Sequence, residues 1–422
     1  MKKSDTPHKD GLFQQRLSLF YSAIFLSIGC YMPYFPLWLS ASGLSEQEMA
    51  IILAAPMIVR VMCAPLISLW ADHSGNYRAI LNRLALGSFT ALIGFSYVQG
   101  FYPILLVASI NAIFWSAIIP LTETMAMQGA RRARINYGQA RSWGSASFIV
   151  GSVATGLVVE RLGASSILGF LIVAGGLIML AALILPQPTG EGRLRAAVAK
   201  GRFAWPSVGI LIKNPVFWLF LVVAGLGQAS HAFYYGFASL HWQSLGIEGG
   251  VIGALWALGV IAEIALFVLA GQKLQQVNPA SLLVLASGVT LVRWAAMTME
   301  PALWVLVLLQ LLHAFSFGLA HLGAMYFLAK AVPENLSATA QGLNATLSAG
   351  VLMGGLISLS GPLYAHFGAG GYGVMAGVAG LAFILGLVLL NAWDRKPLFE
   401  TERKPPSGNT PSEPHTRETH IS

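Results

Sequence analysis

The chain has few charged residues, and their scarcity excludes most classes of soluble protein. Only 10% of its 422 residues are Asp, Glu, Lys or Arg, whereas 56% are hydrophobic. Soluble domains have about 25% charged residues on average. Apolar runs of about 20 residues, the length that crosses a bilayer, recur from position 17 to position 392. The composition therefore predicts an all-α, multi-pass membrane protein.

Signatures of catalysis and of secretion are also missing. The two cysteines, Cys30 and Cys63, lie in apolar runs, which favours small buried hydrophobes over a disulfide or a metal site. The sequence has no phosphate-binding loop, no Cys/His cluster with metal spacing and no Gly-x-Ser-x-Gly turn. We therefore expect that the protein is not an enzyme. The first apolar run, 17–39, is too long for a signal peptide and is expected to be retained as a helix.

The apolar runs divide into two groups of six, which we expect to be twelve transmembrane helices. Their expected bounds are 17–39, 48–71, 77–98, 102–127, 138–160, 164–186, 214–241, 250–271, 279–298, 302–329, 337–360 and 371–392. The two halves would be 17–186 and 214–392, joined by a polar cytoplasmic linker, 187–213. We expect segment 1–16 to be cytoplasmic, and the polar, proline-bearing tail 393–422 to be cytoplasmic and disordered.

Lys and Arg residues fall in every second connection between the expected spans. With the N-terminus inside, Arg161 is the only basic residue of the outside loops. This positive-inside pattern places both termini in the cytoplasm. The net charge of +8 then follows from the topology in a lipid bilayer, and we expect no nucleic-acid partner.

Two groups of six spans around a basic linker are typical of transporters with two halves, each built from inverted three-helix repeats. The 45 glycines fit this arrangement, because small residues let helices approach closely in lipid. Gly350, Gly354 and Gly355 share one span. The alternative is that the glycine content only reflects a membrane composition.

Four ionisable residues lie inside apolar runs: Arg60, Glu123, Glu263 and Arg293. An ionisable group at membrane depth costs at least ~2.5–3.5 kcal/mol on insertion scales, so such groups normally face a partner or a water-filled cavity. We therefore expect the protein to move a solute across the bilayer. A membrane sensor or structural protein that has lost transport is the alternative, and it would retain these charges at a cost.

One loop resembles the signature of a known family. The segment Trp70-Ala-Asp72-His-Ser-Gly75-Asn-Tyr-Arg78 lies between the second and third spans and resembles the loop motif of the major facilitator superfamily. Asp72 and Gly75 match that motif and Arg78 supplies a basic residue, although the leading glycine is absent. The resemblance implies a role for this loop in the conformational change.

Three other segments resemble the lactose permease and phenylpropionate permease branch of that superfamily. They are GCYMPYFPLWL at 29–39, YGQARSWGS at 137–145 and LHAFSFGLAH at 312–321. The resemblance implies a proton-coupled permease of the bacterial inner membrane. We expect it to bind a small-molecule substrate as a monomer, with the proton as coupling ion and no cofactor.

The resemblance assigns a substrate site to the first half. Glu123 and Arg141 match a Glu and an Arg with which lactose permease holds sugar hydroxyls, and the antiparallel return between spans four and five could bring them to one depth. Alternatively, Arg141 snorkels to the cytoplasmic face. Arg60 stands where lactose permease has no arginine, which favours an anionic substrate with a carboxylate for its guanidinium. The alternative for Arg60 is a structural ion pair.

In the second half, Glu263, Arg293 and His313 resemble the residues with which lactose permease binds substrate and couples it to a proton. A carboxylate in low dielectric favours its protonated form, so we expect Glu263 to carry the proton and to release it by pairing with Arg293. Permanent pairing of the two is the alternative. His231 and His321 are expected to assist, because histidine titrates near neutrality, unless they only hydrogen-bond between helices.

Two departures from lactose permease affect the coupling. Ser316 stands where that protein has a proton-handling glutamate, and its lysine in span eleven has no counterpart here. The coupling route is therefore expected to differ in detail.

Aromatic side chains are expected to line part of the pathway, where an aromatic substrate would stack on them. We include Tyr34 and Trp143 in the expected substrate site, with His313 as a further contact. The other candidates are Tyr31, Phe35, Trp38, Tyr234, Tyr235 and Trp256. Packing, or a place in the interfacial aromatic belt, is the alternative.

These expectations favour proton-coupled uptake of a small aromatic carboxylate, such as a phenylpropionate, by rocking one half against the other. A sugar or nucleoside proton symporter that uses Glu123 and Arg141 for hydroxyls is the first alternative. A drug or metabolite exporter is the second. It ranks lower because the fifth span contains no proline, and so no proline–glycine exporter signature.

Overall fold

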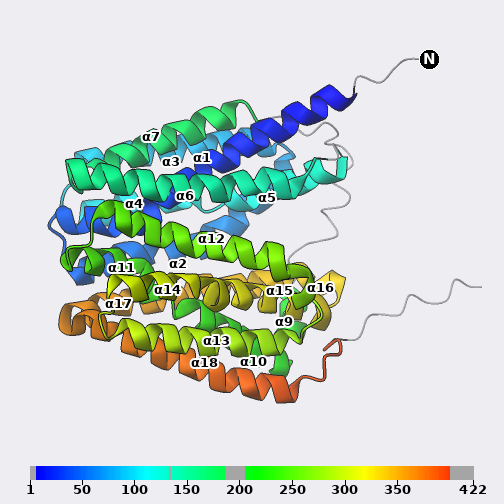
Figure 1. Ribbon diagram of the computed structural model, residues 1–422. Coiled ribbons are helices and arrows are strands. Elements are labelled where there is room, and N and C mark those ends of the chain that lie inside the picture. The colour runs from blue at the N-terminus through cyan, green and yellow to red at the C-terminus, as the bar shows by residue number, and fades with distance from the viewer. Residues whose placement is uncertain (1–5, 133–134, 186–204, 400–422) are drawn as a thin grey trace, which may run out of the picture.

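The computed structural model describes residues 6–132, 135–185 and 205–399, and within these ranges the chain is helical with short connections and no strand. The first half consists of α1 (Thr6–Ala41), α2 (Glu46–Ser74), α3 (Tyr77–Gly94), η1 (Phe95–Tyr97), α4 (Phe101–Trp115), α5 (Ile118–Arg132), α6 (Tyr137–Leu162) and α7 (Ser166–Leu183). In Figure 1, α1, α3, α4, α5, α6 and α7 lie together in the upper part of the view.

The second half packs beside the first (Figure 1). It consists of α9 (Trp205–Ile212), α10 (Pro215–Ala229), α11 (Ala232–Ser244), α12 (Gly249–Leu274), α13 (Pro279–Met297), α14 (Leu303–Leu311), η2 (Ala314–Gly318), α15 (Leu319–Ala331), α16 (Glu334–Ala345), η3 (Thr346–Leu352), α17 (Met353–Phe367), η4 (Gly368–Gly371) and α18 (Tyr372–Ala392). We call the end of the bundle where α1 begins and α18 ends the terminal face, and the other end the opposite face.

The helical membrane class predicted from composition is confirmed. The described residues contain eleven helical stretches long and apolar enough to cross a membrane. The last of them, Glu334–Ala392, contains both α17 and α18, so the set is consistent with twelve spans. The short π-helices η2 and η3 interrupt two of the stretches.

The structure departs from the expected bounds at the start of the first helix, in the linker and in the C-terminal tail. Helix α1 begins at Thr6, well before the predicted 17. The expected linker 187–213 lies largely outside the described residues, but its last part forms α9, because WPSVGILI is apolar and Leu211 is fully buried. The tail begins with packed residues, since the Leu398 N–H donates to the Ala331 carbonyl at 2.8 Å. The disorder expected beyond residue 399 also falls outside the described ranges.

The loop that resembles the superfamily motif joins three helices. Gly75 ends α2 with a left-handed φ of 68°, a conformation that favours glycine. The Tyr77 hydroxyl donates to Asp72, and the Arg78 guanidinium donates to the Leu183 carbonyl at the end of α7. These contacts hold α2, α3 and α7 together at the terminal face.

The halves meet most closely at the opposite face, where α6 crosses α12. The Tyr34 hydroxyl of α1 lies 3.0 Å from the Ser152 carbonyl oxygen of α6 and 2.9 Å from the Gly249 carbonyl oxygen of α12. A Cβ at Gly156 would lie 2.2 Å from the Gly249 carbonyl oxygen, and a Cβ at Gly253 would lie 2.3 Å from the Ser152 carbonyl oxygen. Only glycine allows this approach of two backbones.

Helices α2 and α17 make the second close contact between the halves. A Cβ at Gly361 would lie 2.4 Å from the Glu46 carbonyl oxygen. Both residues lie near the opposite face, since α2 begins at Glu46 and α17 ends at Phe367. The halves are therefore closed against each other at that face.

Toward the terminal face the two halves separate. The buried residues of α12 lie between Ile252 and Gly259, and Val260–Leu274 contains none. On α6, Trp143 is 56% exposed. Figure 1 shows α6 and α12 diverging in this direction. If the termini are cytoplasmic, as the basic residues predict, this is the inward-open conformation.

We predict that Tyr34→Phe shifts the protein toward conformations open at the opposite face. Loss of one hydrogen bond, worth about 1 kcal/mol, changes a population ratio about fivefold. Spin labels at Ser42→Cys and Ser244→Cys, both near the opposite face, should show a larger long-distance fraction by electron paramagnetic resonance. The background would carry Cys30→Ala and Cys63→Ser.

The matched control is Tyr97→Phe, because Tyr97 is 83% exposed and should leave the distances unchanged. Identical distance distributions for Tyr34→Phe and the parent protein would show that the hydroxyl does not hold the halves together.

Candidate functional site

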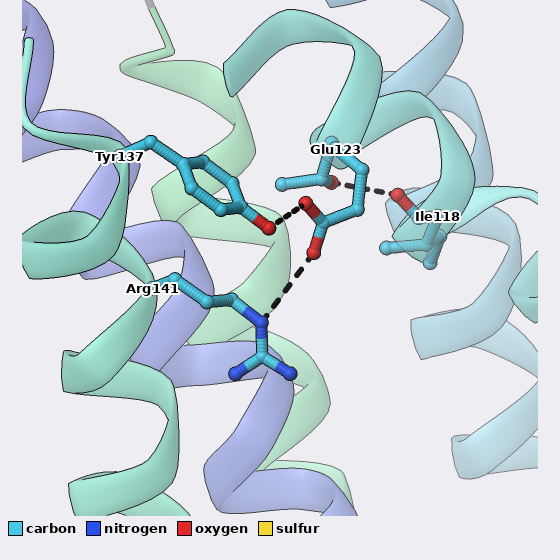
Figure 2. A network of polar contacts seen from close by, with 5 residues as sticks. Ile118, Glu123, Tyr137 and Arg141 are labelled. Carbon is cyan, nitrogen blue, oxygen red and sulfur yellow. Dashed lines mark hydrogen bonds and ion pairs between the residues drawn. The ribbon is translucent and has the colours of Figure 1, made fainter. Parts of the chain in front are cut away.

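Glu123 is the centre of a polar cluster between α5 and α6 (Figure 2). Its Oε1 lies 3.4 Å from Arg141 Nε, and its Oε2 accepts a hydrogen bond of 2.6 Å from the Tyr137 hydroxyl. Tyr137 and Arg141 are four residues apart at the start of α6, so both project from one helix face toward α5. The antiparallel return therefore brings Glu123 and Arg141 together, as the sequence suggested.

The Arg141 guanidinium also lies on aromatic rings of α1. Its central carbon is 4.1 Å from the Phe25 ring centroid and 5.7 Å from that of Tyr21. Gly144, one turn further along α6, makes room, because a Cβ there would lie 2.8 Å from Phe25 Cδ2. The Arg141 and Glu123 side chains remain 33% and 31% exposed, so the pair is open to a ligand.

Arg60 lies near the middle of α2, and its side chain is exposed. It follows Leu53 by seven residues, which places both on one face of the helix. Leu53 points toward Gly236 of α11 in the other half. Arg60 therefore lies on the side of α2 that faces the second half, and no carboxylate forms an ion pair with it among the described residues.

Arg293 of α13 is fully buried. Its Nη2 donates to Gln310 Oε1 at 3.0 Å, and its Nη1 donates to Ser316 Oγ at 3.1 Å and lies 3.2 Å from His313 Nδ1. The guanidinium carbon is 5.0 Å from the Tyr234 ring centroid and 4.5 Å from that of Trp294. In the part of the chain that the structure describes, no carboxylate is within ion-pair distance of Arg293.

The histidines occupy different places around Arg293. His231 is fully buried, with Nδ1 at 3.3 Å from the Gly227 carbonyl oxygen and Nε2 at 3.5 Å from Ser316 Oγ. His313 is partly buried, and its ring centroid is 6.0 Å from that of His231. His321 is exposed on α15, beyond the π-helix η2, and is not part of this network.

Glu263 lies on the half of α12 that contains no buried residues. Its Cγ is 3.5 Å from the position of a Cβ at Gly318. The expected ion pair with Arg293 is not formed in this conformation, and the Arg293 guanidinium instead contacts Gln310, Ser316 and His313.

The aromatic candidates divide into packed and accessible residues. Tyr34, Phe35, Trp38, Tyr234 and Trp256 are buried. Tyr31 and Tyr235 are partly buried, and Trp143 is exposed. In this conformation Tyr34 thus belongs to the closed contact between the halves, and Tyr235 and Trp143 remain available to a ligand.

Sequence reasoning missed Gln310 and the role of Tyr137. Gln310 is fully buried and also accepts a 2.9 Å hydrogen bond from the Tyr234 hydroxyl. Its signal is that it is the only polar residue in the run LWVLVLLQLL. A lone amide in such a run needs a buried hydrogen-bond partner, and Arg293 supplies it.

The interior charges do not balance. Arg60, Arg141 and Arg293 face only two carboxylates at membrane depth, Glu123 and Glu263. An anion that entered between the halves would supply the missing negative charge. The described residues contain no group of His, Cys, Asp and Glu suited to a metal ion.

Two helical halves, closed at one face and carrying ionisable groups between them, define a membrane transporter of the major facilitator type. The chain belongs to the MFS_1 like family, whose family model matches residues 14–372. Its family and its relatives are transporters, so the chain is a transporter and not an enzyme.

Curated relatives extend over most of the chain. It is 32% identical over 369 residues to the "Probable 3-phenylpropionic acid transporter" of Escherichia coli (strain K12), covering 86% of this chain and 94% of that protein. It is 27% identical to the maltose permease of Geobacillus stearothermophilus, covering 79% and 83%. The crystal structure of the nucleoside transporter NupG has the same fold, with a TM-score of 0.75 at 17% identity, covering 90% of this chain and 98% of that one.

The accessible pair Glu123–Arg141 predicts modest and unequal stability effects. Glu123→Gln should lower the free energy of unfolding by less than about 1 kcal/mol, because partly exposed ion pairs contribute little. Arg141→Gln should cost about 1–2 kcal/mol, because it also removes the contact with Phe25. Thermal unfolding in detergent micelles would measure both, together with the double variant.

A coupling free energy well above about 1 kcal/mol between the two substitutions would contradict this description. So would a larger effect of Glu123→Gln than of Arg141→Gln.

Proposed function

We propose that the protein imports a small aromatic carboxylate of the phenylpropionate type together with a proton, by alternating access of a site between the two halves. The observation that carries this proposal is that Arg60 and Arg293 have no carboxylate partner within ion-pair distance among the described residues. An anionic substrate would complete the charge balance. The relative named as a phenylpropionic acid transporter supports the same substrate class.

The arginines and aromatic rings suit such a ligand. A guanidinium binds a carboxylate through two parallel N–H donors, and Arg60, Arg141 and Arg293 are candidates for this contact. Tyr235 and Trp143 offer accessible rings on opposite halves, on which the aromatic part of the substrate would stack.

Glu263 is the proposed proton carrier. It lies on α12 with its Cγ 3.5 Å from the position of a Cβ at Gly318, and it is the one glutamate at membrane depth without an ion pair among the described residues. When Glu263 is protonated, the substrate meets no competing anion. Deprotonation at the terminal face would leave two carboxylates in the site, and their repulsion would favour release. Arg293, His231, His313 and His321 are the proposed assisting groups.

A sugar or nucleoside proton symporter is the second candidate function. The cluster of Glu123, Tyr137 and Arg141 offers acceptors and donors for hydroxyl groups, and the maltose permease relative supports it. Competition by neutral sugars or nucleosides, without competition by carboxylates, would favour this candidate. An exporter remains the third, and the direction of flux in oriented vesicles would identify it.

We predict that 3-phenylpropionate accumulates in proteoliposomes when the outside is made acidic. With one proton per monoanion, a gradient of about one pH unit supports about tenfold accumulation. The process is electroneutral, so collapsing the membrane potential should leave the rate unchanged. Glu263→Gln should abolish accumulation and retain exchange of labelled for unlabelled substrate, because only the proton step is lost.

The matched control is Glu334→Gln, since Glu334 is exposed at the terminal end of α16 and should transport like the parent protein. Accumulation that is independent of the pH gradient would exclude the coupling. Accumulation by Glu263→Gln equal to the parent would exclude Glu263 as the proton carrier.

A further inference from the structure

We propose that Arg293 is the receptor for the substrate carboxylate, reached through the edge of His313, and that Arg60 and Arg141 are secondary. This assignment rests on the proposed function. It places the anion site in the second half of the protein, in the space bounded by α11, α12 and η2.

The first argument is the missing counter-charge. Arg293 is 0% exposed, and a buried ion is costly unless a partner of opposite charge compensates it. Its hydrogen-bond partners, Gln310, Ser316 and His313, are side chains that carry no negative charge. By contrast, Arg141 already has Glu123 as a partner at 3.4 Å. An incoming anion therefore gains more from Arg293 than from Arg141.

The second argument is that the unused groups around Arg293 can donate hydrogen bonds. Arg293 Nε, Gln310 Nε2 and the Tyr372 hydroxyl are all buried and have no hydrogen-bond partner in the described structure. Tyr372 belongs to the same cluster, because its ring stacks on Trp294 at 5.5 Å between centroids. These three groups therefore lack an acceptor in the described structure. A carboxylate offers two oxygens that accept and none that donates.

The third argument is the protonation state of His313. A guanidinium has no acceptor, so His313 Nδ1, 3.2 Å from Arg293 Nη1, must be the acceptor in this contact. His313 is then neutral and carries its proton on Nε2. His313 as a residue is partly exposed. The contact with Arg293 thereby leaves the imidazole with one hydrogen-bond donor, on Nε2, which we assign to the ligand.

The fourth argument is the set of groups beside that donor. Gly259 of α12 packs closely on the imidazole, since a Cβ there would lie 3.3 Å from His313 Cδ2, the atom next to Nε2, so only the absence of a side chain at Gly259 leaves this edge of the ring uncovered by α12. Phe317 stacks on His313 at 5.2 Å between centroids, and the Tyr235 ring stacks on His231 at 5.9 Å. Both Phe317 and Tyr235 are partly exposed, so they can cover an aromatic ring whose carboxylate lies at His313.

Arg60 is the remaining competitor, and its surroundings make it the weaker one. Its side chain is exposed, so the protein encloses its guanidinium less than that of Arg293. A charge-assisted hydrogen bond is stronger where the local dielectric is low, which favours the interior site at Arg293. Arg60 would then attract the anion on its way in.

The test compares a carboxylate with its neutral isostere. Calorimetric binding of 3-phenylpropionate and of 3-phenylpropionamide would be measured on the full-length protein in detergent. We expect the parent protein to prefer the carboxylate by about 10- to 100-fold, the range of a charge-assisted hydrogen bond. Arg293→Gln should remove this preference by weakening carboxylate binding while leaving the amide nearly unaffected.

The second variant, Gln310→Glu, separates binding from a structural role. It keeps the size of a side chain whose Oε1 lies 3.0 Å from Arg293 Nη2, and it supplies the missing negative charge. The carboxylate preference should disappear, and the thermal stability should be equal to or higher than that of the parent. Gln341→Glu is the matched control, because Gln341 is exposed on α16, and it should keep the preference.

Three results would overturn the assignment. In the first, the preference for the carboxylate persists in Arg293→Gln and Gln310→Glu but is lost in Arg60→Gln or Arg141→Gln. This result would move the anion site to the other arginine and leave the proposed function intact. In the second, Arg293→Gln weakens the binding of both ligands equally, which would make the role of Arg293 structural. Or the parent protein binds neither ligand, in which case the proposed substrate class and this assignment fail together.

Discussion

The cost of holding an ion where water cannot reach it governs the interior of this protein. Each arginine between the helices meets that cost differently. Arg141 pairs with the Glu123 carboxylate, which also accepts a hydrogen bond from Tyr137, and it lies on the face of the Phe25 ring. Arg293 has only neutral acceptors and aromatic rings. Arg60 is exposed at the protein surface. The arrangement leaves positive charge in excess among these interior groups, and the proposed anionic substrate would balance it.

Much of the fold could be predicted from composition and spacing alone. Apolar runs long enough to span a bilayer predicted the helices. The antiparallel connection between Glu123 and Arg141, which are eighteen positions apart in the sequence, predicted their contact, and the structure has it at 3.4 Å. These features depend on period and length, which a single sequence contains. The family was also recognisable from short segments that lie on α1, α6 and η2.

The arrangement around Arg293 could not be predicted in the same way. The resemblance to lactose permease suggested that Glu263 would pair with Arg293, yet residues 314–318 form a π-helix and Arg293 contacts Ser316 of that π-helix. A π-helix has no period that distinguishes it in an apolar run. Sequence reasoning also missed helix α9. This helix has only eight residues and follows a basic segment, so it was assigned to the linker. Partners that depend on three or four helices at once cannot be read from spacing.

The contact made by Tyr34 has a consequence for motion between the halves. A phenol has one proton, but two carbonyl oxygens, one on α6 and one on α12, lie within 3.0 Å of it. At any moment only one of them receives the proton, so the hydroxyl can exchange acceptors as the helices slide. The contact between the halves can therefore open in stages while the Tyr34 hydroxyl keeps a hydrogen-bond acceptor. This lowers the energy barrier to opening.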